Sequence, residues 1–295
     1  MTVFTKTQYF IGIFIVFGIF TLYYLFFHSR VSISTFIENK CDLSLKESDN
    51  FICEDDTLWN YRKRVYAIQD ERNMMKINHR IFFSTNWEPN FHCSYSHRVG
   101  KMGDGGKWVC DPFRLKDRPD CLIYSVGSYG EFSFEIDLKQ ILPHCEIHTF
   151  DFDLYKCPTG ICIFHQIKFG DGSHGSKTWA MILKELNHTN RLIDILKMDI
   201  ENSEYVFLPQ IFQVSQSIKP RQILIELHPN EVHIKHSLFE QLRDNEYVIF
   251  NKEPNLEAGI DVAEYAFLRL NSEFFRNSQK TIDLKQNLNR NKIVN

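Results

Sequence analysis

The stretch Cys121–Glu135, CLIYSVGSYGEFSFE, is a short apolar run that ends in two glycines three residues apart and then becomes acidic and aromatic. An apolar run closed by glycine predicts a buried strand followed by a tight turn. Two glycines alone fit either a cofactor-binding turn or an ordinary loop. The segments that follow along the chain therefore decide the fold.

Downstream of this stretch, strand-like apolar runs alternate with amphipathic helical segments, and the chain closes with two strand-like runs that have no helix between them. Such alternation predicts an α/β fold with a mostly parallel sheet covered by helices on both faces. We predict seven strands, at 121–127, 145–151, 161–170, 192–200, 222–229, 247–251 and 264–270. We predict helices at 132–142, 177–186, 204–212 and 236–245.

The N-terminal segment Tyr9–Phe27 is an apolar run without a charged side chain. As a helix it would extend roughly 28 Å, which is enough to cross the core of a bilayer. A cleaved signal peptide has a shorter apolar region followed by small residues. Because bulky residues follow here, we predict an uncleaved transmembrane signal anchor. Lys6 on one side and Arg30 on the other leave the positive-inside bias nearly neutral.

Two features favour a lumenal or extracellular location for the main body. The chain has eight cysteines, and Asn187-His188-Thr189 is an acceptor triplet for N-glycosylation. We therefore predict a single-pass type II membrane protein of the secretory pathway, in the endoplasmic reticulum or Golgi, with the membrane as a partner. The net charge of -3 and the lack of a long basic run give no indication of nucleic-acid binding.

After the anchor, the segment from Asp56 to Lys76 has apolar residues at helical spacing behind an acidic start. We predict a helix whose apolar stripe packs on the main domain. The stripe consists of Leu58, Tyr61, Val65, Ile68 and Met75.

The segment Val99–Phe113, VGKMGDGGKWVCDPF, has three glycines in four positions, which predicts a loop that can approach a ligand or another part of the chain closely. Cys93 and Cys110 flank this loop, and we predict that they are bridged. Cys121 and Cys145 begin neighbouring strands and are predicted to be buried thiols.

Cys157 and Cys162 flank the sequence PTGI, so a turn or a disulfide would close this segment. With histidines nearby in the sequence they could suggest zinc, but their C-x4-C spacing is unusual for a structural zinc site. We therefore predict no metal. The histidines considered with them are His144, His148 and His165.

In an open α/β sheet, ligands bind outside the carboxyl ends of the strands. This rule selects the candidate residues from the ends of the predicted strands. The candidates are the turn Gly127-Ser128-Tyr129-Gly130, then Asp151, then Asp199 with Glu201, and finally His228.

Four segments, GDGGKWVCDP, SVGSYGEFSFE, HTFDFD and LKMDIENSEY, together resemble the S-adenosylmethionine-dependent methyltransferases. More closely, they resemble membrane-anchored methyltransferase-like proteins that carry G-D-G-G-K before the cofactor fold. LKMDIENSE also resembles the K-x-D-x-E-G-x-E segment of FkbM-type methyltransferases, with Asn202 where glycine is usual. The resemblance covers about residues 90–270. It implies the class I methyltransferase fold, with its closing strand pair, and S-adenosylmethionine as cofactor.

The resemblance also implies roles for individual residues. Asp151 would hold the ribose, and Asp199 would face the cofactor or the acceptor. From the residues themselves, Glu201 would contact the cofactor or cap the helix that begins near Glu204. His228, before Pro229, would be a general base, since the unperturbed pKa of histidine lies near neutrality, or a structural histidine. Ser125 replaces the acidic residue of the family's acidic-x-Gly-x-Gly-x-Gly pattern, and Tyr129 and Glu131 replace its later glycines. The residues implied to line the methionine and adenosine are Ser125, Gly127, Ser128 and Gly130.

Two alternatives to a methyltransferase remain open at this point. Asp151-Phe152-Asp153 is a D-x-D triplet of the kind with which lumenal glycosyltransferases hold a metal and a nucleotide sugar. A catalytically inactive binding module would explain the altered glycine pattern. For a methyltransferase, small-molecule, glycan and polypeptide acceptors all fit. The predicted organisation is a tail and signal anchor at 1–30, a stem at 31–55, a helical and loop extension at 56–120, a methyltransferase-like domain at 121–270 and a polar tail at 271–295.

Overall fold

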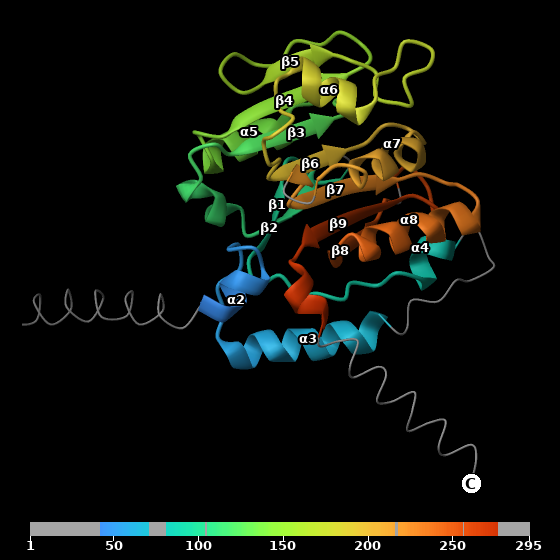
Figure 1. Cartoon of the computed structure of the whole chain (residues 1–295). Coiled ribbons are helices and arrows are strands. Elements are labelled where there is room, and N and C mark those ends of the chain that lie inside the picture. Colours follow the sequence, from blue (N-terminus) through green and yellow to red (C-terminus); the bar gives the residue numbers. More distant parts are fainter. Residues whose placement is uncertain (1–41, 71–80, 104, 216–217, 256, 277–295) are drawn as a thin grey trace, which may run out of the picture.

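A computed structural model describes residues 42–70, 81–103, 105–215, 218–255 and 257–276 of the 295-residue chain (Figure 1). The predicted signal anchor and residues 277–295 of the predicted tail lie outside these ranges. Within them, no helix is long and apolar enough to cross a membrane.

The centre of the fold is a seven-stranded sheet with the strand order β5-β4-β3-β6-β7-β9-β8. Neighbouring strands are parallel from β5 to β7, whereas β9 runs antiparallel to both β7 and β8. This confirms the predicted seven-stranded, mostly parallel sheet and its closing strand pair. The strands are β3 (Leu122–Val126), β4 (Glu146–Asp151), β5 (Ile163–Gln166), β6 (Ile195–Met198), β7 (Gln222–Leu227), β8 (Tyr247–Pro254) and β9 (Ala263–Arg269).

Helices cover both faces of this sheet (Figure 1). The four helices predicted from the sequence are present, and the last begins at Val232, four residues earlier than predicted. They are α5 (Ser133–Ile141), α6 (Trp179–Glu185), α7 (Glu204–Ile211) and α8 (Val232–Asp244). The N-terminal part adds α2 (Asp42–Glu47), α3 (Asp56–Asp70), α4 (Phe82–Thr85), the hairpin strands β1 (Ser96–Val99) and β2 (Lys107–Cys110), and the 3-10 helix η2 (Pro112–Asp117).

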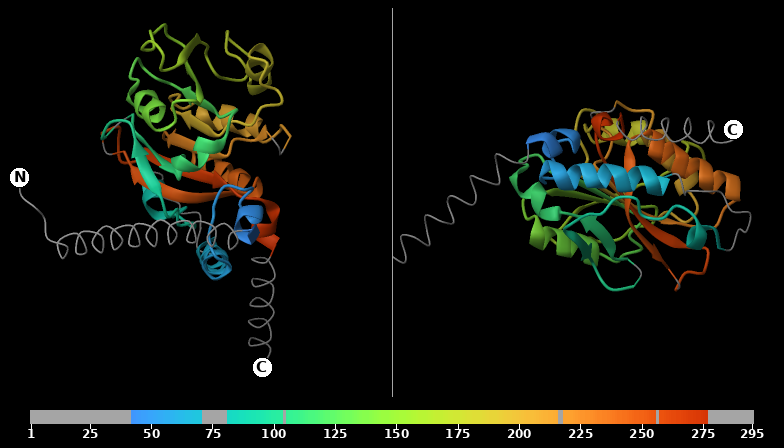
Figure 2. Two further views of the ribbon diagram at one scale, coloured as in Figure 1. Left: turned by 90° about the vertical axis from the view of Figure 1, so that its left-hand side faces the viewer. Right: turned by 90° about the horizontal axis from the view of Figure 1, so that it is seen from below.

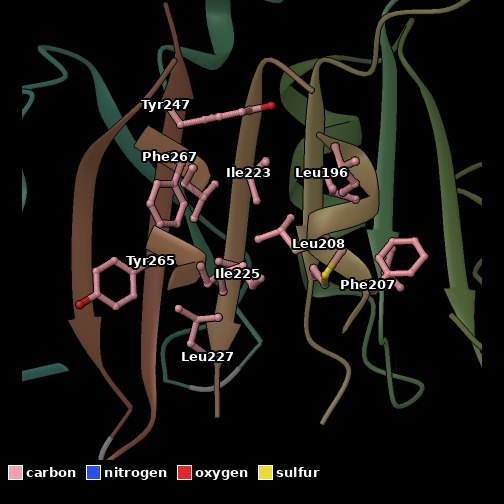
Figure 3. Packing of buried hydrophobic residues seen from close by; sticks show 14 of the residues in the cluster. Leu196, Phe207, Leu208, Ile223, Ile225, Leu227, Tyr247, Tyr265 and Phe267 are labelled. Carbon is pink, nitrogen blue, oxygen red and sulfur yellow. The ribbon is translucent and has the colours of Figure 1, made fainter. Parts of the chain in front are cut away.

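The apolar side chains form two clusters, one on each face of the sheet. Successive residues of a strand point to opposite faces, so that Ile223 and Ile225 of β7 face one cluster and Leu224 faces the other. Figure 3 shows the first cluster, in which Phe207 and Leu208 of α7 pack on the strands. Burial on both faces explains why these strands read as continuous apolar runs.

The N-terminal segment is part of this packed body. Residues 42–55, which were assigned to the stem, begin with α2 and bring Phe51 and Ile52 into the second cluster. The ring of Trp59 lies 5.3 Å from that of Phe274, which belonged to the predicted polar tail. Figure 2 shows α3 lying across one end of the molecule.

The described part of the apolar stripe predicted for α3 faces the solvent instead of the domain, and Met75 lies outside the described residues. Leu58 and Tyr61 are 54% and 65% exposed, and Val65 and Ile68 are exposed as well. The buried face contains Trp59, Tyr66 and Ala67, together with Lys63, whose charge is paired with Glu47. The prediction is wrong because two large aromatic rings and one ion pair determine which face of the helix is buried.

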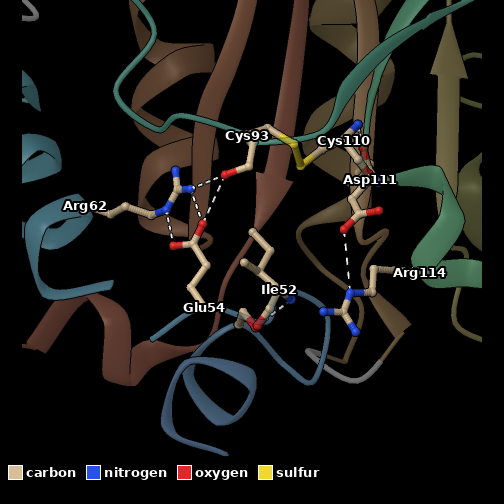
Figure 4. The surroundings of a disulfide bond; sticks show 10 residues. Ile52, Glu54, Arg62, Cys93, Cys110, Asp111 and Arg114 are labelled. Atoms are coloured by element: carbon tan, nitrogen blue, oxygen red, sulfur yellow. Dashed lines mark hydrogen bonds and ion pairs between the residues drawn. A yellow bond between two sulfur atoms is a disulfide. The ribbon is translucent and has the colours of Figure 1, made fainter. Parts of the chain in front are cut away.

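Three disulfides link the described residues. Cys93–Cys110 joins the segment before β1 to the end of β2, as predicted, and lies close to the ion pair of Glu54 with Arg62 (Figure 4). Cys157–Cys162 closes its short loop. No described cysteine is free.

The third disulfide, Cys121–Cys145, corrects the prediction of two buried thiols. The register of β3 and β4 places Leu122 opposite Glu146, so the residue before each strand lies beside its counterpart. The two Cα atoms are 4.7 Å apart, which is within disulfide range.

Candidate active site

The carboxyl ends of β3, β4, β6 and β7 lie at one edge of the sheet because these strands are parallel. This edge brings together the turn at 127–130, Asp151, the segment from Asp199 to Glu201, and His228. The positions predicted from strand ends therefore lie in one region. The burial, hydrogen-bond partners and charge of several of these residues differ from what the sequence implied.

Gly127 ends β3 in a left-handed conformation, with φ of +78°. A Cβ at this position would lie 1.6 Å from the carbonyl oxygen of Asp199. The Gly127 carbonyl accepts a hydrogen bond of 2.8 Å from Lys197. The close contact between the ends of β3 and β6 therefore requires glycine at position 127, whether or not the turn binds a ligand.

Asp151 holds the turn in place. One carboxylate oxygen accepts 2.8 Å hydrogen bonds from the amides of Ser128 and Tyr129, and the other accepts a 3.0 Å bond from the amide of Asp153. The side chain is buried. Asp151 therefore caps the turn, and one oxygen retains capacity for a further donor such as a ribose hydroxyl.

The remaining turn residues differ in their access to the edge. Ser125 is fully buried in β3, and its Oγ has no partner among the residues described, so this side chain faces the interior. Ser128 is also buried, whereas the ring of Tyr129 is 87% exposed. At Gly130, where φ is +74°, a Cβ would lie 2.8 Å from the ring of Tyr155.

A row of carboxylates crosses the sheet beside this turn. Glu226 of β7 lies opposite Glu264 of β9. The register of β6 with β7 ends at Met198 opposite Ile225, so Asp199 comes next to Glu226. The Asp199 and Glu226 side chains are hydrogen-bonded to each other. Three acidic side chains thus lie side by side on one face of the sheet.

Lys107 of β2 is inserted into this row. Its ammonium group bonds the carboxylate of Glu264 and lies 3.9 Å from that of Asp199. The lysine is buried, and its hairpin packs against β7 and β9. The lysine of the G-D-G-G-K segment therefore lies as a cation within the carboxylate row.

The pKa values of the neighbouring Asp199 and Glu226 carboxyls are shifted in opposite directions. Burial, with the negative charge of Asp199 beside it, raises the pKa of Glu226 to about 8. Burial would also raise the pKa of Asp199, but Lys107 and Lys197 outweigh it and hold that pKa below its usual range. At neutral pH Asp199 is ionised and Glu226 carries a proton, an arrangement that suits proton transfer.

His228 is a cation in this environment. Its Nδ1 lies 3.0 Å from a carboxylate oxygen of the fully buried Glu204, and its Nε2 lies 3.2 Å from one of Glu201, which is largely exposed. Burial acts to lower the pKa of His228, but Glu204 and Asp199 raise it to about 9. Of the two roles predicted for His228, this environment favours the structural one over the general base, because a protonated imidazole has no free lone pair at neutral pH.

Four residues of this site were missed in the sequence: Lys107, Glu204, Glu226 and Glu264. Glu226 gave the clearest available signal, since it is the one charged residue inside the apolar run QILIEL. Lys107 was part of a quoted segment, but its partners come from strands more than 90 residues away in the sequence. Only the sheet register brings them together.

The D-x-D alternative finds no support in this geometry. The amide of Asp153 donates to the carboxylate of Asp151, and Asp153 itself is exposed. Neither residue belongs to a group of three or more potential metal ligands in the described part of the chain.

The fold is Rossmann-like, and the candidate residues lie at the carboxyl ends of its parallel strands. A family model described as a methyltransferase domain matches residues 42–269, and the chain belongs to that family. Family membership supports S-adenosylmethionine as the cofactor. An ionised Asp199 beside a turn with an exposed aromatic ring suits a ligand that carries a sulfonium cation and an adenine ring. No curated protein matches the chain.

Several solved structures are similar to the chain at low sequence identity. Precorrin-6y C5,15-methyltransferase from Geobacter metallireducens GS-15 is 12% identical, with a TM-score of 0.33, over 54% of this chain and 83% of that one. Fibrillarin from Methanococcus jannaschii is 10% identical, with a TM-score of 0.33, over 60% and 84%. Fibrillarin from Aeropyrum pernix, bound to S-adenosyl-L-methionine, is 13% identical, with a TM-score of 0.32, over 60% and 84%.

Proposed function

We propose that this protein is an active, membrane-anchored methyltransferase whose catalytic domain lies in the lumen of the secretory pathway. It would transfer a methyl group to an oxygen or nitrogen acceptor that must lose a proton. The observation that carries the proposal is the row of Asp199, Glu226 and Glu264 beside the glycine turn, with Lys107 inserted into it.

In this mechanism, bound S-adenosylmethionine supplies an electrophilic methyl group on a sulfonium. The turn at 127–130, capped by Asp151, would position the donor. Asp199 would accept the proton of the acceptor as the methyl group passes to it from the sulfonium sulfur, which leaves as a neutral thioether. The proton on Glu226 hydrogen-bonds to Asp199 and keeps two adjacent negative charges from forming. Positioning of donor and acceptor is worth up to about 7–11 kcal/mol of the barrier.

His228 is assigned an electrostatic role. As a cation fixed by Glu204, it stabilises negative charge on Asp199 and on an acceptor that approaches the same edge. Glu201, on the exposed side of this histidine, would contact the acceptor or the cofactor.

Location in the secretory pathway is supported by two observations. Three disulfides link the described residues, and disulfides persist mainly in oxidising compartments. Asn187 is exposed in the turn after α6, where a glycan could be attached without disturbing the core. A mobility shift on glycosidase treatment that is absent in Asn187→Gln would support this location, and complete cytosolic accessibility of the domain would contradict it.

The test of activity uses the full-length chain in detergent. Calorimetry with S-adenosylmethionine should show binding, and labelled methyl groups should be incorporated into a glycan, lipid or protein fraction of microsomes. Asp199→Asn should abolish incorporation, whereas the matched control Asp120→Asn, an exposed carboxyl before β3, should not. No affinity for S-adenosylmethionine in the parent chain would favour an inactive module and overturn the proposal.

A further inference from the structure

A second cluster of ionisable side chains lies on the face of the sheet opposite the carboxylate row. It contains Glu146 and His148 of β4, His165 of β5, and His188, which follows α6. His148 lies opposite Tyr124 of β3, on the face of the sheet that carries the first apolar cluster. The carboxylate row lies on the other face. The catalytic scheme above uses none of these residues.

Two histidines of this cluster direct the same ring nitrogen toward one carboxylate. The Nε2 of His148 lies 2.6 Å from Oε1 of Glu146, and the Nε2 of His188 lies 3.9 Å from the same oxygen. These potential ligand atoms all lie within 4.8 Å of one another. Only small shifts would place all three around a single ion.

The other nitrogen of each ring is held by a second partner. The Nδ1 of His148 lies 2.7 Å from the Nε2 of His165, and the Nδ1 of His188 lies 2.6 Å from the hydroxyl of Tyr124. Metal-binding histidines are oriented in this way, with one nitrogen fixed by a neighbour and the other facing the metal.

The protonation states also suit a metal ion. Burial lowers the pKa of His148 and lowers those of His165 and His188 to about 4, so all three rings are neutral at pH 7. For Glu146, burial acts to raise the pKa, but the hydrogen bonds from His148 and Arg191 lower it to about 2. Neutral imidazole and ionised carboxylate are the forms that bind metals.

A cation already bridges two of the ligands. The Nη1 of Arg191 lies 2.7 Å from Oε2 of Glu146 and 3.1 Å from the Nε2 of His188. The side chains of Arg191 and Glu146 are 30% and 36% exposed, so the guanidinium can move into solvent and an ion can enter from the same side.

We propose that Glu146, His148 and His188 form a zinc site, with water as the fourth ligand and with Arg191 in its place when the metal is absent. Two imidazoles and one carboxylate are a ligand set that zinc accepts in four-coordinate sites. The ion would cross-link β4 to the segment after α6. Because it would bind only the folded chain, it would also stabilise the folded state. The sequence analysis considered His148 only with the nearby cysteines and histidines, whereas Glu146 and the more distant His188 were not among the candidates.

The test is calorimetry of the full-length chain, prepared without a histidine tag and stripped with EDTA, using zinc chloride as the titrant. The parent should bind one equivalent, and His148→Gln and His188→Gln should lose this binding. Tyr124→Phe should weaken it about tenfold, as removal of an orienting partner does. The control His174→Gln changes an exposed histidine outside the cluster and should leave binding unchanged.

The variant Arg191→Met distinguishes most clearly between a zinc site and a purely structural hydrogen-bond network. If the guanidinium and zinc compete for Glu146 and His188, its removal should tighten zinc binding. A purely structural hydrogen-bond network would instead lose stability with no gain in zinc affinity. The inference is overturned if the parent binds no zinc, if both histidine variants bind as the parent does, or if Arg191→Met binds no more tightly. If circular dichroism shows that the histidine variants do not fold, the zinc affinities of Arg191→Met and Tyr124→Phe test the proposal instead.

Discussion

The ammonium group of Lys107 lies 3.9 Å from the carboxylate of Asp199, and both side chains are largely withdrawn from solvent. The lysine comes from the hairpin that precedes the α/β sheet, and the aspartate comes from the end of β6. Burial acts to lower the pKa of Lys107, but Glu264 and Asp199 outweigh it and raise that pKa. The hairpin therefore helps to determine the charge state of the candidate active site.

Replacement of this lysine should be costly. Lys107→Met removes the cation that bonds the buried Glu264 and lies beside Asp199, and the free energy of unfolding should fall by about 3–5 kcal/mol. Urea unfolding measures this loss. The double variant Lys107→Met/Glu264→Gln should recover part of it, and Lys101→Met, at an exposed position, is the control. A loss as small as that of the control would show that Lys107 is not needed for stability.

Two glycines with the same backbone conformation should respond differently to alanine. Gly127 and Gly160 have φ of +78° and +79°, but only Gly127 has a neighbour in the way. Gly160→Ala should cost about 1–2 kcal/mol, the usual penalty of the left-handed region. Gly127→Ala should cost more, because its Cβ would overlap the Asp199 carbonyl. Equal losses in thermal or urea unfolding would contradict the close approach of β3 and β6.

Stability should fall as the solution becomes acidic. His165 and His188 have folded-state pKa values of about 4, below the ~6.5 of an unfolded chain. The unfolded state therefore takes up these protons first, so the stability that they contribute is fully present above pH ~6.5 and is lost as the pH falls through 4. Urea midpoints measured in EDTA between pH 7 and pH 4 should show this decline. His165→Gln should reduce its slope, whereas the exposed His174→Gln should not.

The Cys121–Cys145 disulfide should contribute more stability than Cys157–Cys162. The first joins residues 24 apart in the sequence and the second residues 5 apart. In the chain-entropy description these loops correspond to ~3.5 and ~2.2 kcal/mol. Replacing each pair by alanines and comparing the thermal unfolding midpoints tests the order. A larger effect of the shorter loop would mean that unfolded-chain entropy does not dominate.

The sequence by itself determined which elements form. Each strand and helix of the main domain has a local pattern of apolar residues, and the closing strand pair distinguishes this sheet from other α/β folds. Because parallel strands end at one edge, the strand ends alone predicted that Asp151, Asp199 and His228 would lie in one region. The Cys93–Cys110 disulfide was also predicted from its position around the glycine loop.

Only the tertiary structure decided the pairings between distant segments. The buried face of α3 is selected by Phe274 and Glu47, which no local periodicity can reveal. The proximity of Cys121 and Cys145 follows from the register of β3 with β4. The protonation of His228 likewise depends on carboxylates that the folded chain gathers around it. A pKa is determined by charges within a few ångströms, and the chain brings those charges together only when it folds.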